Sequence, residues 1–198
     1  MNREMLRIEG IQIVLRDWIL EDLSVYEYWQ TEDLEWKKWN GPYYPLVSAE
    51  KLQQDLKKRR EKILQKDFSS PRQLLVIADK HSNKFLGTVS WYWQSKETNW
   101  LSNGIVLFDT RHRSKGIGFE ALGLWNQYLF DSMPNIARLD LRTWSGNLGM
   151  MRLAEKLGYT LEARFRKARI VQGKYYDSIG YGVLREEWES LYSDGFAV

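Results

Sequence analysis

The sequence contains no cysteine among its 198 residues and only two histidines. The absence of cysteine excludes disulfide bridges, thiolate zinc sites and a cysteine nucleophile, and it fits a reducing cytoplasm. The two histidines, His81 and His112, are isolated from each other in the sequence. Two isolated imidazoles do not make a metal site, so we expect no metal.

Long apolar runs are also missing. Residues 1–10 mix charged residues with isolated apolar ones, unlike a signal peptide, and no stretch approaches the length needed to cross a bilayer. The formal charge of +3 comes from interspersed basic and acidic residues. It permits an anionic ligand without requiring nucleic acid. We expect one domain over residues 1–198, without repeats or low-complexity linkers and with no membrane partner.

The hydrophobic pattern predicts a mixed α/β (α+β) fold, with a mostly antiparallel central sheet flanked by helices. The turn-rich tetrapeptide 81–84 predicts an antiparallel hairpin in the middle of the chain, and the pair Gln172-Gly173 predicts a second one near its end. The expected strands are 11–16, 74–79, 85–94, 100–108, 137–143, 160–170 and 174–184, and the expected helices are 21–30, 49–66, 116–130 and 147–157.

The most informative segment is the unit that joins the strand at 100–108 to the following helix. The apolar end of this strand runs into a short basic loop, and Gly116 and Gly118 stand where the helix begins. Glycines let the backbone approach a ligand closely. The first amides of a helix have no intrahelical partner and carry partial positive charge. Together these features favour a phosphate or pyrophosphate at the helix start.

Basic residues in the same loop strengthen this interpretation. Arg111, Arg113 and Lys115 add full positive charges beside the expected anion. Two glycines at a helix start can also be a packing device, and exposed basic residues can simply be solvated. The spacing matches neither a Walker loop nor a dinucleotide-binding fingerprint.

Two segments resemble signatures of the GNAT acetyltransferase superfamily. Residues 113–118, RSKGIG, resemble its [QR]-x-x-G-x-[GA] motif. Residues 147–159, NLGMMRLAEKLGY, are similar to its second signature, an asparagine that opens a helix ending in EKLG and an aromatic residue. The resemblance covers roughly residues 11–188 and is nearest to the RimJ/RimL-type branch.

The resemblance implies an enzyme that moves an acetyl group from acetyl-CoA to a primary amine by direct attack, without a covalent intermediate. The strand end would hold the pantetheine arm, the loop amides would hold the pyrophosphate, and Asn147 would bond near the cofactor arm or the substrate. The implied cofactor-binding residues are Val106, Leu107, Phe108, Arg113, Ser114, Lys115, Gly116, Ile117, Gly118 and Asn147.

The positions where this family often carries catalytic groups are occupied differently here. Ala154 stands where many members have a tyrosine, and Met150 stands where the RimJ/RimL branch often has a serine. Ser102 and Asn103 precede Gly104, where a glutamate is common. The sequence therefore names no general acid or base.

The missing base favours an acceptor amine of low pKa. An α-amino group with a pKa of about 7.7–8.0 is substantially neutral at physiological pH, whereas a lysine amine with a pKa of about 10.4 is not. Protein N-termini and small-molecule amines are therefore the expected acceptors. Aromatic residues at Trp39, Tyr44, Trp91, Trp93 and Trp144 are the candidates for the acceptor pocket.

Two further possibilities stay open. The replaced catalytic positions allow a non-catalytic CoA-binding sensor. The basic run Arg164, Arg166, Lys167 and Arg169 is ordinarily a solvated ribbon paired across strands, but it also suits docking of an acidic substrate or of a second subunit in a homodimer. The mixture of acidic and basic residues argues against nucleic-acid binding.

Overall fold

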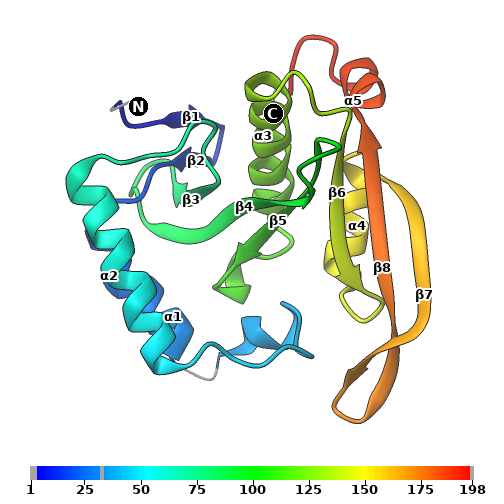
Figure 1. The fold of residues 1–198 in the computed structure, drawn as a ribbon, viewed down its shortest axis with the longest axis horizontal. Helices are drawn as coiled ribbons and strands as arrows, with labels where there is room; N and C mark the ends of the chain where they lie inside the picture. The colour runs from blue at the N-terminus through cyan, green and yellow to red at the C-terminus, as the bar shows by residue number, and fades with distance from the viewer. Residues whose placement is uncertain (1–3, 32–33, 197–198) are drawn as a thin grey trace.

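A computed structural model describes residues 4–31 and 34–196. One eight-stranded sheet carries helices on both faces (Figure 1). The strands are β1 (Arg7–Glu9), β2 (Ile13–Arg16), β3 (Leu74–Asp79), β4 (Phe85–Ser95), β5 (Trp100–Leu107), β6 (Arg138–Trp144), β7 (Thr160–Val171) and β8 (Lys174–Leu184). The helices are α1 (Glu21–Thr31), α2 (Ala49–Gln65), α3 (Ile117–Ser132), α4 (Leu148–Lys156) and α5 (Arg185–Leu191), with short 3-10 helices η1 (Glu35–Lys38) and η2 (Thr110–His112).

The sheet order is β1-β2-β3-β4-β5-β6-β8-β7, and every neighbouring pair is antiparallel except β5 with β6. The parallel pair is short, because only Leu101, Ser102 and Asn103 of β5 find partners on β6. The prediction of a mixed, mostly antiparallel sheet flanked by helices is therefore confirmed.

Strand alternation divides the apolar side chains between two cores. Ile13 and Leu15 of β2 pack into a large core with α3, α4 and α5, whereas Val14 between them faces a smaller core with α1 and α2. Successive residues of a strand point to opposite faces, so one short apolar run supplies both cores. This arrangement fixes which residues can face helix α3 and which face the opposite side.

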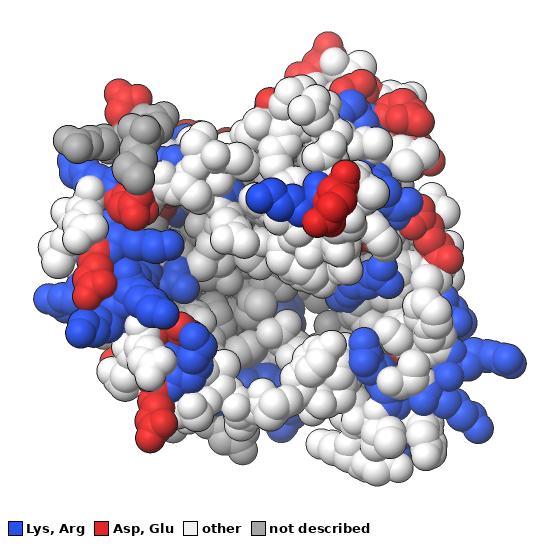
Figure 2. All heavy atoms as spheres, viewed as in Figure 1, with Lys and Arg blue, Asp and Glu red and all other residues white. Residues whose placement is uncertain are grey.

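Helices α1 and α2 cover only one part of their face of the sheet. The smaller core contains residues of β2, β3, β4 and β5 but, among the residues that the structure describes, none of β6, β7 or β8. Beyond it the same face is polar: the side chains of Arg138 and Arg142 lie against Gly182 and Gly180 of β8. Figure 2 shows a hollow in this region, between the α1–α2 side and the β7–β8 side.

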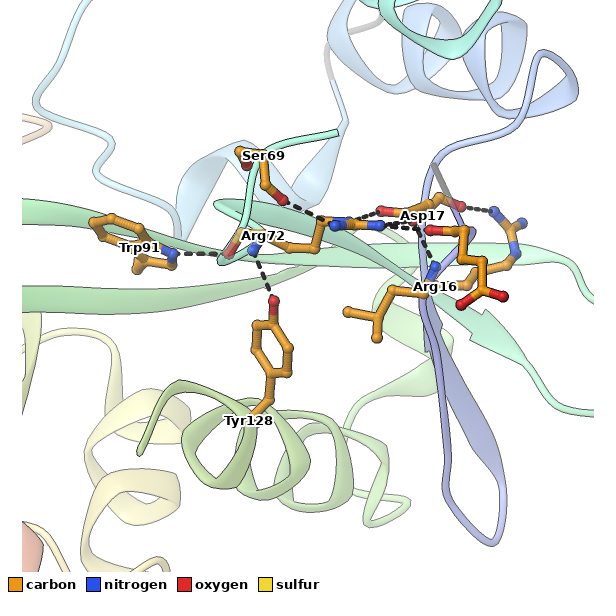
Figure 3. Close-up of polar contacts among 8 residues, drawn as sticks. Arg16, Asp17, Ser69, Arg72, Trp91 and Tyr128 are labelled. Carbon is orange, nitrogen blue, oxygen red and sulfur yellow. Dashed lines mark hydrogen bonds and ion pairs between the residues drawn. The ribbon is translucent and has the colours of Figure 1, made fainter. Parts of the chain in front are cut away.

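An ion pair in the interior joins elements that are far apart in the sequence (Figure 3). Arg72 precedes β3, and its guanidinium donates to both carboxylate oxygens of Asp17 at 2.9 and 3.0 Å. It also donates to the carbonyl oxygen of Ser69, while its backbone N–H and C=O bond to the Tyr128 hydroxyl and the Trp91 indole. Arg72 therefore ties β2, β4 and α3 together.

Two features differ from the sequence-based expectation. The first expected strand begins at Ile13 rather than residue 11, because the chain turns there, with Gly10 N–H donating to Ile13 O. The short elements β1, η1 and α5 were not expected, since each offers too few residues for a hydrophobic period. In the described ranges, no helix is both long enough and apolar enough to span a membrane.

Candidate active site

A cleft of about 490 Å³ lies where β5 separates from β6. Its walls come from the end of β5, the start of α3, one face of α4 and the segment around η1. The residues that line it are Trp36, Trp39, Asn40, Ile105, Val106, Leu107, Arg113, Ser114, Gly116, Gly118, Phe119, Asn147, Gly149, Met150, Arg152, Leu153 and Lys156.

The opening between β5 and β6 is a consequence of strand pairing. Pairing between them stops at Asn103 and Leu141, yet β5 stays paired with β4 as far as Leu107 and β6 stays paired with β8 as far as Trp144. Among the described residues, the β5 edge that faces β6 thus has no strand partner after Asn103. An unpaired edge offers backbone donors and acceptors to an extended ligand.

The start of α3 forms one end of the cleft. Its N-cap residue, Gly116, has a φ of 85° and no side chain to cap the helix. The amides of the first turn are therefore available for an anionic ligand. Glu120 holds this turn in place, because its buried carboxylate accepts hydrogen bonds from the backbone N–H groups of Gln12 and Ile13 on the β2 side at 2.9 and 3.2 Å.

Positive charge gathers around the cleft from two elements. Arg113 lies in the loop before α3, with its guanidinium 5.4 Å from the ring centre of Trp39. Partial burial lowers the pKa of Arg113 from its usual value, an effect opposed by the charge of Glu35. Arg152 and Lys156 stand four residues apart on α4 and line the same cleft. An anionic ligand is thus met by three cations as well as by helix amides.

Two other basic residues of the loop do not line the cleft. Arg111 is strongly exposed and pairs with Asp109, which also caps η2 by accepting from the Arg111 backbone N–H. Lys115 is exposed and points elsewhere, although its carbonyl oxygen accepts from the Gln12 side chain. Of the three loop cations that the sequence suggested, only Arg113 reaches the site.

Asn147 connects two walls of the cleft by side-chain hydrogen bonds. Its Oδ1 accepts from the Met150 N–H and so caps α4, while its Nδ2 donates to the carbonyl oxygen of Trp39 at 3.1 Å. The indole N–H of Trp144 donates to the same oxygen, also at 3.1 Å. These contacts fix the segment after η1 against the start of α4.

The two roles of Asn147 can be separated by substitution. We expect Asn147→Asp to keep the cap, since a carboxylate accepts from a helix N–H, but to lose the bond to Trp39 O, because it has no donor. Hydrogen exchange of residues 36–44 should then become faster, with thermal stability changed by less than about 1 kcal/mol. Asn147→Ala should lose both functions and cost about 1 kcal/mol more. Unchanged hydrogen exchange in the Asn147→Asp protein would show that the bond from Asn147 to Trp39 O does not hold this segment in place.

Several of the expected site residues meet at the cleft and others do not. Val106, Leu107, Arg113, Ser114, Gly116, Gly118, Asn147 and Trp39 line it. Phe108 and Ile117 are buried in the two cores, and Trp144 is buried beside the cleft. Tyr44 is exposed.

Trp91 and Trp93 lie on the other face of the sheet from α1 and α2. Both point toward the large core, where Trp91 is buried and donates its indole N–H to Arg72 O. Strand parity explains this, because Val89, Trp91 and Trp93 share the α3 side of β4 while Tyr92 between them faces the opposite side. The structure does not bring these two tryptophans to the cleft.

The α4 face of the cleft was not recognised from the sequence. Gly149, Arg152, Leu153 and Lys156 follow the i, i+3, i+4, i+7 spacing of one helix face, a signal that was available. Trp36, Asn40, Ile105, Phe119 and Met150 also line the cleft. The residues near η1 reach the cleft because of the tertiary fold, which no local sequence pattern indicates.

Among the residues that the structure describes, the cleft lining contains no aspartate, glutamate or histidine. Met150 lines it, whereas Ala154, also on α4, is buried in the large core. Ser102 is buried and accepts from the Gln94 side chain, and Asn103 is buried in a polar contact with Asn126 and Tyr159. Within residues 4–31 and 34–196, no group of three or more acidic or histidine side chains is placed to hold a metal ion.

Two sequence comparisons with known proteins match most of the chain. A family model described as the acetyltransferase (GNAT) domain matches residues 12–160. The chain is 27% identical over 129 residues to YokL, an uncharacterized N-acetyltransferase of the SPbeta prophage of Bacillus subtilis, which covers 65% of this chain and 69% of that protein.

Solved structures show the same fold at low sequence identity. The spermidine N-acetyltransferase of Vibrio cholerae, solved with CoA and spermine, has a TM-score of 0.71 and 16% identity, covering 89% of this chain and 98% of that one. The ribosomal-protein-S5-alanine acetyltransferase of Vibrio fischeri has a TM-score of 0.70 and 20% identity, covering 92% and 98%.

Proposed function

This chain belongs to the GNAT family of acetyltransferases, and we propose that it transfers the acetyl group of acetyl-CoA to an α-amino group or another primary amine of low pKa. Family membership makes it an acyltransferase that uses acetyl-CoA. The nature of the acceptor and the residues that handle it are our proposal.

The observation that carries the proposal is the junction of an unpaired β5 edge with the uncapped start of α3. Acetyl-CoA supplies an acetyl thioester. In this chain, Val106 and Leu107 would hold its extended arm along β5, and the amides of residues 116–118 with Arg113 would hold its diphosphate. The cleft provides fitting partners for each part, because it is apolar along β5 and cationic at α3 and α4.

The lining residues favour a direct reaction with an amine that is already neutral. Because no carboxylate or imidazole of the described residues lines the cleft, none of their side chains is placed there to take a proton from an ammonium group. The β5 backbone remains as a source of hydrogen bonds to the carbonyl oxygen that becomes negative during attack. An acceptor with a high pKa would reach this site mainly as the unreactive cation.

A pair of peptides tests this proposal. At about pH 7.5, we expect a peptide with a free N-terminus to release CoA thiol at least about a hundredfold faster than an N-terminally blocked peptide whose only amine is lysine, since about a third of α-amines but only about one lysine in a thousand is neutral. The rate for the α-amine should rise with pH and level off above about pH 8, the pKa of the amine itself. Equal rates for the two peptides, or a preference for lysine, would contradict the proposal.

The RimJ/RimL-type branch is the finer assignment that we propose. The fold similarity to a ribosomal-protein acetyltransferase supports it, as does the second sequence signature at residues 147–159. The acetyl-CoA cosubstrate and the cysteine-free chain both fit a cytoplasmic location. Tight binding of acetyl-CoA without thiol release from any amine would instead support a non-catalytic sensor.

A further inference from the structure

Residues 163–178 of the β7–β8 hairpin carry a formal charge of +4, which exceeds the net charge of +3 of the entire chain. We call residues 163–178 of this hairpin the arm. It contains five basic residues, Arg164, Arg166, Lys167, Arg169 and Lys174, and one acidic residue, Asp177. The other 24 basic and 25 acidic residues leave the rest of the chain at −1, although the whole chain is +3. Lysine and arginine side chains project from this hairpin on the lower right of Figure 2.

Most of the arm cations have no acidic partner. Asp177 accepts from Arg164 at 3.0 Å and from the backbone N–H of Lys167 at 3.0 Å, and these bonds lower its pKa. Among the residues that the structure describes, no ion pair involves Arg166, Lys167 or Lys174. The interpretation of a ribbon neutralised across its strands therefore holds for Arg164 but not for these three residues.

The arm contains a bulge that directs cations outward. Phe165 pairs with Ser178 and Arg169 pairs with Tyr176, so β7 has two more residues than β8 between these points. Lys167 lies in this bulge with a φ of 56°, a conformation that costs a non-glycine residue free energy. Bulges re-aim side chains and are common beside active sites. Here the bulge leaves Arg166 and Lys167 exposed.

The arm also contacts residues next to the cleft, including Tyr43 in the segment that carries the cleft residues Trp39 and Asn40. The Arg169 guanidinium lies 4.4 Å from the ring centre of Tyr43, whose pKa is raised mainly by burial and lowered in part by this arginine. Tyr176 packs edge-on against Trp144 at 4.8 Å, and Trp144 donates to Trp39 O. The side chain of Trp39 lines the cleft, so a single short segment connects the cleft to the arm.

We propose that the arm docks the carboxylates of an acidic peptide whose free α-amino group enters at the β5–β6 opening. This inference rests on the proposed function. From Leu141 to Trp144 is three residues along β6, and two strand spacings separate β6 from β7, so the near end of the arm, at Phe165, lies about 14 Å from the opening. About four extended residues span that distance, which places the acidic side chains near positions three to six of the peptide.

The chemistry of the arm favours a polypeptide over other occupants. Phe165, Ile170 and Tyr175 are exposed beside the cations and would pack against apolar side chains of a peptide. A second copy bound about a twofold axis at this edge would place two strongly basic arms against each other. A polyamine would be repelled by the same charges.

Two matched peptides test the proposal. They share an N-terminal residue and length, and one carries Asp or Glu at positions three to six where the other carries Asn or Gln. With thiol release as the readout at low ionic strength, we expect the KM of the acidic peptide to be about tenfold lower, as two or three charge-assisted contacts allow. The difference should shrink as salt is added, because these contacts are exposed.

Charge reversal locates the effect. We expect Arg166→Glu combined with Lys167→Glu, both beside the near end of the arm, to abolish the preference for the acidic peptide, with no change in acetyl-CoA affinity or in the turnover of a small uncharged primary amine. Lys57→Glu combined with Lys58→Glu on α2 changes the charge equally at exposed positions and should leave the preference intact. Both variants keep the buried residues of the hairpin.

The outcomes distinguish this inference from the proposed function. Equal KM values for the two peptides, or the same loss in both charge-reversed variants, overturn the acidic-peptide inference while thiol release still supports the transferase. A dimer that the arm variant dissociates, or an oligonucleotide that binds the arm without any peptide preference, also overturns it. Absence of thiol release with every primary amine contradicts the proposed function itself.

Discussion

Replacing Gly118 with leucine is expected to weaken acetyl-CoA binding about a hundredfold, or about 2.8 kcal/mol, in a protein that remains folded. A Cβ at this position would lie 3.5 Å from Leu153 Cδ2 and 3.9 Å from Leu107 Cδ1, both ordinary contacts. The first added carbon therefore costs the protein nothing. Leu153 and Leu107 line the cleft, so the remaining carbons of the leucine would occupy space that the ligand needs.

The effect on stability should have the opposite sign from the effect on binding. Gly118 lies in the first turn of α3 without a positive φ, and a glycine inside a helix is less stable than alanine or leucine by up to about 1 kcal/mol. The melting temperature should therefore stay constant or rise by a few degrees, roughly 2–4 °C per kcal/mol for this size. Calorimetric titration with acetyl-CoA and thermal unfolding measure the two effects separately.

Matched variants make the Gly118 result specific. Gly118→Ala should reduce affinity only a few-fold, and Ser132→Leu, at the exposed far end of the same helix, should not reduce it. Gly116 is less informative, because its φ of 85° strains any side chain and mixes folding with binding. Wild-type affinity in the Gly118→Leu protein would show that the ligand lies elsewhere.

The extent to which the sequence predicts this site depends on which residues are close in the chain. The loop from Arg113 to Gly118 is local, so its glycines and its helix start are visible in the sequence, and all of these features reach the cleft except Lys115 and the buried Ile117. The spacing of the α4 face is equally local. The strands and helices follow the hydrophobic period of the sequence, which explains why the predicted bounds of most of them lie within two residues of the observed bounds.

Long-range relations account for the rest. The sequence around Trp91 and Trp93 does not indicate which face of the sheet they occupy, because the alternation along a strand can be assigned to a face only after the sheet order and register are known. The bond from Asn147 to Trp39 O spans more than a hundred residues. The unbalanced charge of the arm also depends on the fold, since only the structure shows that the Asp177 carboxylate already accepts hydrogen bonds from Arg164 and from the backbone N–H of Lys167.

Substituting Arg72 with methionine should cause the largest loss of stability, about 3–5 kcal/mol. Asp17 is 1% exposed, and without Arg72 its buried carboxylate would keep only the hydrogen bond from Leu6 N–H. An unpaired buried charge is costly because water cannot solvate it. The carbonyl oxygens of Ser69 and Glu4 would lose their donor as well. The melting temperature should fall by roughly 6–20 °C.

A set of comparison variants separates the buried charge from simple loss of a side chain. Arg72→Lys should recover little, since lysine cannot make the two parallel bonds from Nε and Nη2 to Asp17. Lys51→Met, which breaks the exposed pair with Asp55, should cost under about 1 kcal/mol.

Combining Arg72→Met with Asp17→Asn should cost less than the sum of the single changes, because the second change removes the unpaired charge that the first creates. Additive losses would mean that the two residues stabilise the protein independently, and then the network in Figure 3 would not be the unit that holds β2, β4 and α3 together. Because Arg72 lies outside the cleft, acetyl-CoA affinity measured well below the melting temperature should not change.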